Sequence, residues 1–306
     1  MDVKITVPVL LIGFNRPDYI ETTFQKIREA RPTRLYVAID GARKERPDEQ
    51  GLVDKVISIV KQVDWDCEVS YRFNEINLGA EVTVSSAVRW VLEKELYTVV
   101  LEDDIVAPLS FFYFMQEMLE RYKDASEIRS VSGNNFTPLD TENDYFFSVY
   151  GHIWGWGTWR RVWQDFDLNR EVSKQHCSLA FTKTFTSSLS EAKYWKRRFE
   201  TMRKSGAGNC TWDAVFSYQT KVKGQLAIVP KVNLATNIGV EGLHARGESS
   251  YHFHKADENF KVERHPEEIK CWWEYDAYHF ANHFPKQKTF ATRLIGYIKR
   301  LILQKR

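Results

Sequence analysis

The sequence predicts an α/β fold built on a doubly wound, mostly parallel sheet. Short apolar runs without polar alternation are typical of strands buried on both faces, and segments with helical periodicity separate them. The most informative run is Thr98–Leu101, which is followed directly by three acids, Glu102, Asp103 and Asp104. Since ligands bind beyond the carboxyl ends of strands in open α/β sheets, we expect a site at that edge.

The first unit of this pattern is a strand, a loop and a helix. Residues 7–14 are mostly apolar and predict the first strand, and Asn15-Arg16-Pro17 follows as a loop. Asp18 stands three residues before Glu21, which is the spacing of a capping box. The sequence therefore predicts a helix that begins at Asp18.

The same pattern recurs along the first half of the chain. Residues 35–39 predict a second strand that ends at Asp40-Gly41, and residues 67–73 predict a third. Helical stripes follow each of these strands, and a further amphipathic helix is expected over residues 110–122, after the acidic strand. Alternating strands and helices predict the parallel sheet.

The second half of the sequence has a different character. Residues 140–250 are rich in Trp, Gly and Asn, and we expect short strands and loops there that complete the sheet. About two-thirds of the ten tryptophans are expected in the core. Residues 290–306 predict a basic amphipathic helix, which would either bind an anionic membrane surface or dock on its own domain.

Composition excludes some classes of protein and favours a compartment. The 306 residues carry 43 Lys and Arg against 41 Asp and Glu, a formal charge of +2, so no basic field indicates a nucleic-acid partner. Four widely spaced cysteines form no metal or disulfide pattern, which favours a reducing compartment. With no signal peptide and no apolar segment of spanning length, we expect a cytoplasmic protein, with peripheral contact at the inner face of the membrane through residues 290–306.

The acidic cluster is the candidate site. Clustered carboxylates repel one another, so a hard cation that neutralises them is a reasonable occupant, although a solvated acidic turn is the alternative. Neither a dinucleotide fingerprint nor a P-loop follows any predicted strand. A metal held by the acids would supply the missing phosphate-binding chemistry.

Taken in order, Arg16, Asp40, the Glu102–Asp104 triplet and Trp212-Asp213 resemble a known family. The chain is similar to the inverting GT-A glycosyltransferases typified by N-acetylglucosaminyltransferase I, in a short bacterial-type form, over about residues 5 to 245. The resemblance implies a Rossmann-like GT-A domain over 1–250, with a nucleotide-binding half over 1–135 and an acceptor half over 136–250. Residues 251–306 would form a C-terminal extension.

The resemblance also implies roles for the residues at the strand ends. Asp104 would bind Mn²⁺ or Mg²⁺, Asp103 would face the ribose, and Glu102 would support the nucleotide site. Arg16 would contact the nucleotide, and Asp40 would accept a hydrogen bond from the base. Without the family, Arg16 could be a surface charge and Asp40 a turn former.

Other implied roles fall in the second half. Trp154, Gly155 and Trp156 resemble the loop beside the donor sugar, and with Trp212 they would form the donor and acceptor pocket. Asp213 resembles the catalytic base, although an N-cap of the following helix is an equal alternative from the residues alone. His244 lies in a segment that resembles the late loop over the diphosphate, where it would be a second metal ligand or an ordinary loop histidine.

The resemblance implies a metal-dependent inverting glycosyltransferase. It would transfer a sugar from a nucleotide-diphosphate donor, expected to be a UDP-sugar, to a hydroxyl on a saccharide or lipid-linked saccharide. Cell-surface polysaccharide or lipopolysaccharide synthesis would suit the expected compartment. The alternatives are a non-catalytic saccharide- or nucleotide-binding protein and a sugar nucleotidyltransferase on a related fold.

Overall fold

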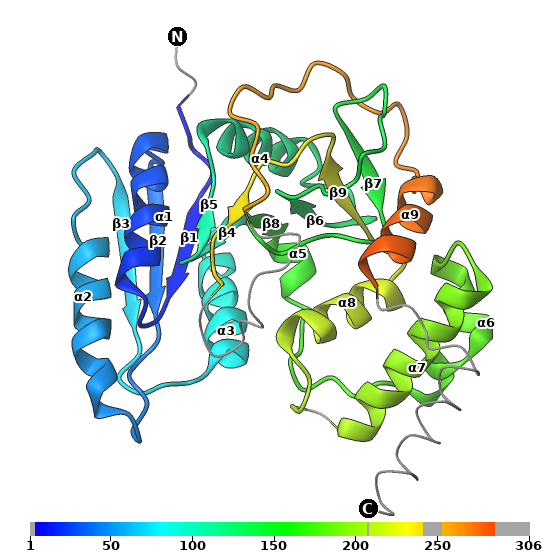
Figure 1. The fold of residues 1–306 in the computed structure, drawn as a ribbon, viewed down its shortest axis with the longest axis horizontal. Helices are drawn as coiled ribbons and strands as arrows, with labels where there is room; N and C mark the ends of the chain where they lie inside the picture. The colour runs from blue at the N-terminus through cyan, green and yellow to red at the C-terminus, as the bar shows by residue number, and fades with distance from the viewer. Residues whose placement is uncertain (1–3, 207, 241–252, 285–306) are drawn as a thin grey trace, which may run out of the picture.

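The fold is a mixed sheet with helices on both faces (Figure 1). The structure is a computed structural model that describes residues 4–206, 208–240 and 253–284. Within these ranges, eight strands form one sheet in the order β3-β2-β1-β4-β8-β6-β9-β7, and β5 and β10 form a separate ribbon. Four of the seven strand pairings in the large sheet are parallel. The predicted α/β class and its mostly parallel sheet are confirmed.

The strands of the described residues are short. They are β1 (Val9–Gly13), β2 (Arg34–Ile39), β3 (Glu68–Phe73), β4 (Tyr97–Glu102), β5 (Ile105–Val106), β6 (Ile128–Ser132), β7 (Tyr145–Ser148), β8 (Trp156–Trp159), β9 (Leu226–Pro230) and β10 (Thr236–Asn237).

The helices vary more in length. The α-helices are α1 (Pro17–Ala30), α2 (Gln50–Val60), α3 (Ala80–Leu92), α4 (Leu109–Arg121), α5 (Arg160–Trp163), α6 (Leu179–Thr182), α7 (Leu189–Ser205), α8 (Trp212–Val222) and α9 (Trp273–His283), and the 3-10 helices are η1 (Pro47–Glu49), η2 (Lys174–Cys177) and η3 (Lys183–Phe185).

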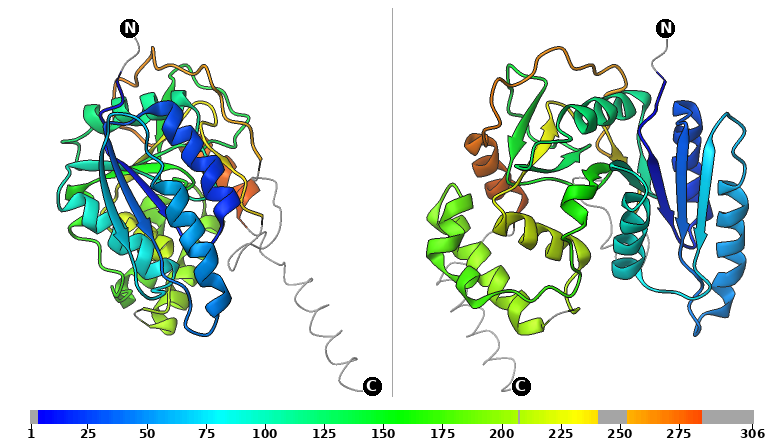
Figure 2. Two further views of the ribbon diagram at one scale, coloured as in Figure 1. Left: turned by 90° about the vertical axis from the view of Figure 1, so that its left-hand side faces the viewer. Right: turned by 180° about the vertical axis from the view of Figure 1, so that it is seen from behind.

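The first half is the part that the sequence predicted closely. β1 runs parallel to both β2 and β4, and Ile12 lies opposite Ala38 on one side and Glu102 on the other. Right-handed crossovers place α1 and α2 on one face of these strands and α3 on the other (Figure 2). The carboxyl ends of β1, β2 and β4 therefore meet at one edge.

The start of α1 differs from the prediction. Arg16 occupies the N-cap position and Pro17 the first turn, and no side chain caps the helix. Proline suits this position because its missing N–H would have no helical partner there. The predicted capping box of Asp18 and Glu21 is therefore wrong, and Asp18 lies in the first turn, where its charge favours the helix dipole.

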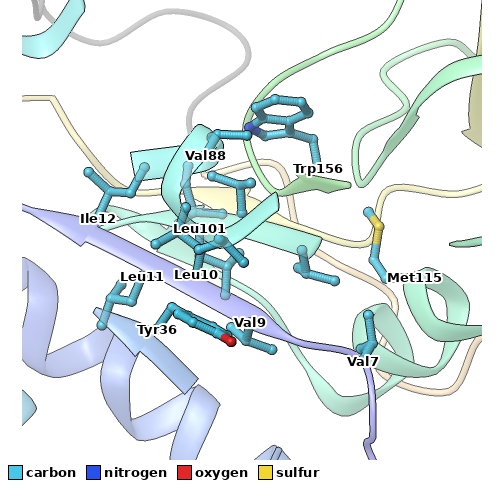
Figure 3. Packing of buried hydrophobic residues seen from close by; sticks show 14 of the residues in the cluster. Val7, Val9, Leu10, Leu11, Ile12, Tyr36, Val88, Leu101, Met115 and Trp156 are labelled. Carbon is cyan, nitrogen blue, oxygen red and sulfur yellow. The ribbon is translucent and has the colours of Figure 1, made fainter. Parts of the chain in front are cut away.

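Strand β1 lies at the centre of the main core. All five of its residues are buried, as expected for a strand covered on both faces. Figure 3 shows Leu10 and Leu11 packed among side chains of the neighbouring elements, including Leu101 of β4 and Val88 of α3. Six of the ten tryptophans are buried, which confirms the expected share: Trp65, Trp156, Trp159, Trp163, Trp195 and Trp212.

The region after residue 140 is more helical than the sequence predicted. Besides short strands and loops and the expected helix after Asp213, which is the 11-residue α8, it contains the 17-residue helix α7. The Ser188 side chain accepts the backbone N–H of Glu191 and caps α7, and Gly206 ends it with a φ of 83°. A narrow apolar stripe on α7 packs into a second core cluster together with β7, β9 and α9: Trp195, Phe199 and Met202.

Residues 253–284 run along the second half of the sheet and end in α9. The carboxylate of Asp276 is fully buried and accepts hydrogen bonds from the Ser148 hydroxyl and from the backbone N–H of Val149 at 3.3 Å. These contacts fasten α9 to the end of β7. No helix among the described residues is long and apolar enough to cross a bilayer, and the predicted helix over 290–306 lies outside the described residues.

Candidate active site

Three loops meet at the carboxyl edge of the sheet. Arg16 follows β1, Asp40 follows β2, and the acidic triplet ends β4, with Asp103 and Asp104 in the turn that leads into β5. The Thr23 hydroxyl of α1 donates to the backbone carbonyl of Asp103 at 2.8 Å and holds this turn. The parallel strands thus place in one region residues that are up to 88 positions apart in sequence.

Arg16 pairs with both aspartates of the turn and offsets part of their charge. Its Nε donates to Asp103 Oδ2 at 3.1 Å, and its Nη2 contacts both Asp103 Oδ1 and Asp104 Oδ2, the latter at 2.9 Å. Although burial alone would lower the pKa of the Arg16 guanidinium, the two carboxylates raise it above its ordinary value. Arg16 is therefore a fixed positive charge of the site rather than a surface residue.

The acidic triplet is electrostatically strained. Burial, together with repulsion from Asp104 and Asp103, raises the pKa of Glu102 to about 8. Burial also raises the pKa of Asp103 to about 6, although Arg16 acts in the opposite direction. A turn that concentrates negative charge in this way favours further positive charge nearby.

Gly239 lies directly against Asp104, a contact that the sequence did not predict. A Cβ atom at residue 239 would overlap the Asp104 carboxylate and lie 2.9 Å from the Asp104 Cβ. The backbone N–H of Ile238 donates to the Asp104 carbonyl at 3.0 Å, beside the β5–β10 pairing. Glycine at residue 239 leaves the Asp104 carboxylate its space, because a side chain there would overlap it.

Asp40 is bound by its own loop. Its carboxylate accepts the backbone N–H groups of Leu78 and Gly79, both at 3.0 Å, and the side-chain amides of Asn74 and Asn77, also at 3.0 Å. These contacts order the segment that leads into α3. Asp40 therefore has the turn-forming role that was the alternative from the sequence. A contact between Asp40 and a nucleotide base stays a prediction.

Asp213 lies in the first turn of α8 and is exposed to solvent. The N-cap position belongs to Thr211, so the alternative that Asp213 caps the helix is wrong. The backbone N–H of Trp212 donates to the carboxylate of Glu81, in the first turn of α3. The charge of Asp213 adds slightly to the rise in the pKa of Glu102, which burial and the charges of Asp104 and Asp103 mainly cause.

The Trp- and Gly-rich loop is divided between core and surface. Trp156 and Trp212 stack with ring centroids 5.5 Å apart and are only 1% and 5% exposed. Both rings are therefore core residues. A contact of either ring with a bound sugar stays a prediction. Trp154 is partly exposed beside Phe136, and Gly155 has a φ of 74° and accepts the backbone N–H of Gly133 at 2.8 Å.

His244 lies outside the described residues. Within the described residues, no group of three or more His, Cys, Asp or Glu side chains converges as a metal cage. Asp103 and Asp104 are paired with Arg16 in this structure, and their binding of a cation stays a prediction.

Comparison with known proteins identifies no family. No family profile matches the sequence, and no curated protein is significantly similar to it. Among solved structures, the chain is similar to the mannosyltransferase PcManGT from Pyrobaculum calidifontis, in complex with GDP-Man and Mn²⁺, with 11% identity, 72% of this chain and 74% of that chain covered, and a TM-score of 0.37. It is also similar to the inositol-1-phosphate CTP transferase from T. maritima, with 11% identity, 76% and 89% covered, and a TM-score of 0.38. HddC from Yersinia pseudotuberculosis matches with 10% identity, 53% and 80% covered, and a TM-score of 0.32. At these values the similarities assign no activity to this chain.

Proposed function

We propose that the protein is a metal-dependent inverting glycosyltransferase of the GT-A type, related to the N-acetylglucosaminyltransferase I family. It takes a nucleotide-diphosphate sugar, a UDP-sugar, and transfers the sugar to a hydroxyl on a saccharide or lipid-linked saccharide of a cell-surface polysaccharide or lipopolysaccharide. Residues 1–135 bind the nucleotide, residues 136–250 bind the acceptor, and residues 251–306 form an extension.

The proposal is carried by one juxtaposition of charges. Arg16 with Asp103 and Asp104 forms a charged cluster beyond β4, and the charge of Asp213, in the first turn of α8, adds to the rise in the pKa of the neighbouring Glu102. A sugar donor between the two sides would have its diphosphate at the cluster and its anomeric carbon toward Asp213. Arg16, Asp40, Glu102 and Asp103 are then the nucleotide-binding residues.

The residues at the turn fit a cation whose coordination shell is completed by phosphate groups of the substrate. Asp104 keeps 14% of its side chain exposed, its carboxylate packs directly against Gly239, and Asp103 lies next to it in the chain. Mg²⁺ and similar ions are commonly held by one or two carboxylates and substrate phosphates rather than by a full protein cage. Such an ion, Mn²⁺ or Mg²⁺, would act as a Lewis acid for the departing diphosphate. His244 is retained as a further candidate ligand.

Asp213 is the proposed general base. Its carboxylate takes the proton of the acceptor hydroxyl while the hydroxyl oxygen attacks the anomeric carbon. The bond from that carbon to the diphosphate oxygen breaks, and the nucleoside diphosphate leaves from the opposite face. Trp154 and Gly155 border this space, and Trp156 and Trp212 support it from the core.

A donor assay tests the proposal against its two rivals. The purified chain is incubated with UDP- and GDP-sugars with and without Mn²⁺, and nucleoside diphosphate release is measured. We expect metal-dependent release from one nucleotide sugar. Pyrophosphate release from a nucleoside triphosphate and a sugar phosphate would instead identify a nucleotidyltransferase, and binding without turnover would identify a non-catalytic protein.

A further inference from the structure

Positive charge is concentrated in two segments of this nearly neutral chain, residues 286–306, which lie outside the described residues, and residues 174–204. Residues 174–204 contain eight Lys and Arg and two Glu, a formal charge of +6, whereas the whole chain carries +2. The segment includes α6 and α7, which lie at the opposite end of the molecule from β3 and α2 (Figure 1). Most of these cations are exposed: Lys174, Lys183, Lys193, Arg197, Arg198, Arg203 and Lys204.

A cavity of about 490 Å³ opens at one side of this segment. Three cations line it, Arg170, Lys174 and Arg203, together with the acid Glu171. The rest of the lining includes an apolar group: Leu168, Val172, Met202 and Val215. The cavity thus combines an apolar lining with a net positive charge, in the size range of small-ligand sites.

The cations of this cavity are weakly neutralised. Arg170 lies 4.0 Å from the carboxylate of the exposed Asp167, at the limit of an ion pair. Neither Lys174 nor Arg203 forms an ion pair in the part of the chain that the structure describes. Cavities lined by charge of one sign concentrate ligands of the opposite sign.

The cavity adjoins the start of α8. Cys210 and Val215, which both line it, stand on either side of Asp213 in the sequence. The Asp103–Asp104 turn, in contrast, is at the end of β4 and contributes no lining residue. The cavity is therefore separate from the Asp103–Asp104 turn and lies next to α8, the helix that carries the proposed base.

We propose that this cavity binds an anionic saccharide acceptor, one that carries a carboxylate or a phosphate. Arg170, Lys174 and Arg203 bind the anionic group, because guanidinium and ammonium groups form strong charge-assisted hydrogen bonds with carboxylate and phosphate. The apolar lining packs against the C–H faces of the sugar ring. The assignment of this saccharide as the acceptor rests on the proposed glycosyltransferase function.

Binding of defined probes tests the cavity directly. The probes are trigalacturonate for a carboxylate, a glycerol phosphate trimer for a phosphate, and galactotriose as the neutral control, each titrated by calorimetry. We expect at least one anionic probe to bind tenfold or more tightly than galactotriose. The double variant Lys174→Glu/Arg203→Glu should weaken that binding at least tenfold, and raising the salt from 50 to 300 mM should weaken it in the wild type.

A matched control separates the cavity from the general charge of the segment. Lys183→Glu/Lys193→Glu makes the same charge change at two exposed residues outside the cavity, and we expect less than a twofold effect. Equal binding of galactotriose, or equal losses in both double variants, would overturn the proposal. The protein could instead bind phosphatidylglycerol vesicles and none of the anionic trimers, with the vesicle binding lost only in Lys183→Glu/Lys193→Glu. That result would assign the segment to a membrane surface.

Mn²⁺-dependent binding of UDP is measured on the same proteins. Intact binding of an anionic probe without any UDP binding would reject the glycosyltransferase and leave a saccharide site. Intact UDP binding without binding of any anionic probe would reject the cavity proposal alone.

Discussion

The carboxylate of Glu81, in the first turn of α3, accepts the backbone N–H of Trp212, the residue before Asp213. This N–H is among those at the start of α8 that have no partner within the helix. The bond links the first α/β half of the chain to the helix that carries the proposed base. We therefore expect Glu81 to position Asp213.

We expect Glu81→Ala to lower the rate of sugar transfer by about tenfold, because small displacements of a reacting group are costly. Glu81→Gln keeps an oxygen acceptor and should restore most of the rate. Steady-state kinetics should show the loss in kcat, with the KM for the donor unchanged. Equal losses in both variants would indicate that the carboxylate acts in another way.

Asp213→Asn should lower transfer by roughly 10²–10⁴-fold, because the amide keeps the shape of the side chain but cannot take a proton. Mn²⁺-dependent donor binding should hardly change, and calorimetry checks it. Asp54→Asn, at an exposed residue of α2, is the matched control and should transfer at the wild-type rate. A fully active Asp213→Asn enzyme would place the base elsewhere.

Asp104→Ala should abolish the metal dependence of UDP binding, since it removes both an oxygen ligand and a negative charge from the turn. Calorimetry with UDP, with and without Mn²⁺, measures the effect. A variant that keeps both its affinity and its metal dependence contradicts the assignment of Asp104.

Gly239→Ala should weaken Mn²⁺-dependent UDP binding, because the new methyl group would displace the Asp104 carboxylate. Gly51→Ala is the control, because nothing lies within 4 Å of a Cβ built there in α2. That change should leave UDP binding intact and stabilise the fold by about 0.5–1 kcal/mol, since alanine is the better helix former. Identical UDP affinity in the wild type and Gly239→Ala would argue against a role for the Gly239 contact.

The free energy of unfolding should fall as the pH drops below about 6.5, the ordinary pKa of the imidazoles. The Nε2 atoms of His152 and His279 lie 3.2 Å apart, and burial lowers the pKa of His152 to about 3 and lowers that of His279 further. The unfolded chain therefore binds protons in this range that the native state does not, which costs up to about 1.4 kcal/mol per pH unit for each histidine.

Urea denaturation at pH 7.5, 6.0 and 5.0 measures this loss. His279→Gln removes one titrating group and keeps a hydrogen-bonding side chain beside His152, so its stability should depend less steeply on pH. Parallel pH profiles for the wild type and the variant would contradict the assignment to this pair.

The sequence determined the first half of the fold because its signals are local. The apolar run of β1 and the helical stripes of α1 to α3 specify strand and helix from neighbouring residues, and the parallel order places the acids of β4 at the carboxyl edge of the sheet. The start of α1 was missed because Asp18 matched a capping box, whereas Pro17 at the beginning of the helix decided the boundary. Helix α7 was missed because its narrow apolar stripe is set among many cations.

The tertiary structure alone decided how the candidate site is assembled. Arg16 contacts Asp103, 87 positions later in the sequence, and Glu81 contacts Trp212, 131 positions later. No local sequence pattern carries information over such separations. The structure shows that Trp156 and Trp212 are buried in the core and that Asp213 is exposed. The sequence did not show this difference, because all three residues belong to similar polar and aromatic segments. Residue type is a property of the chain, but hydrogen-bond partners, burial and the space beside a carboxylate arise only when distant segments pack together.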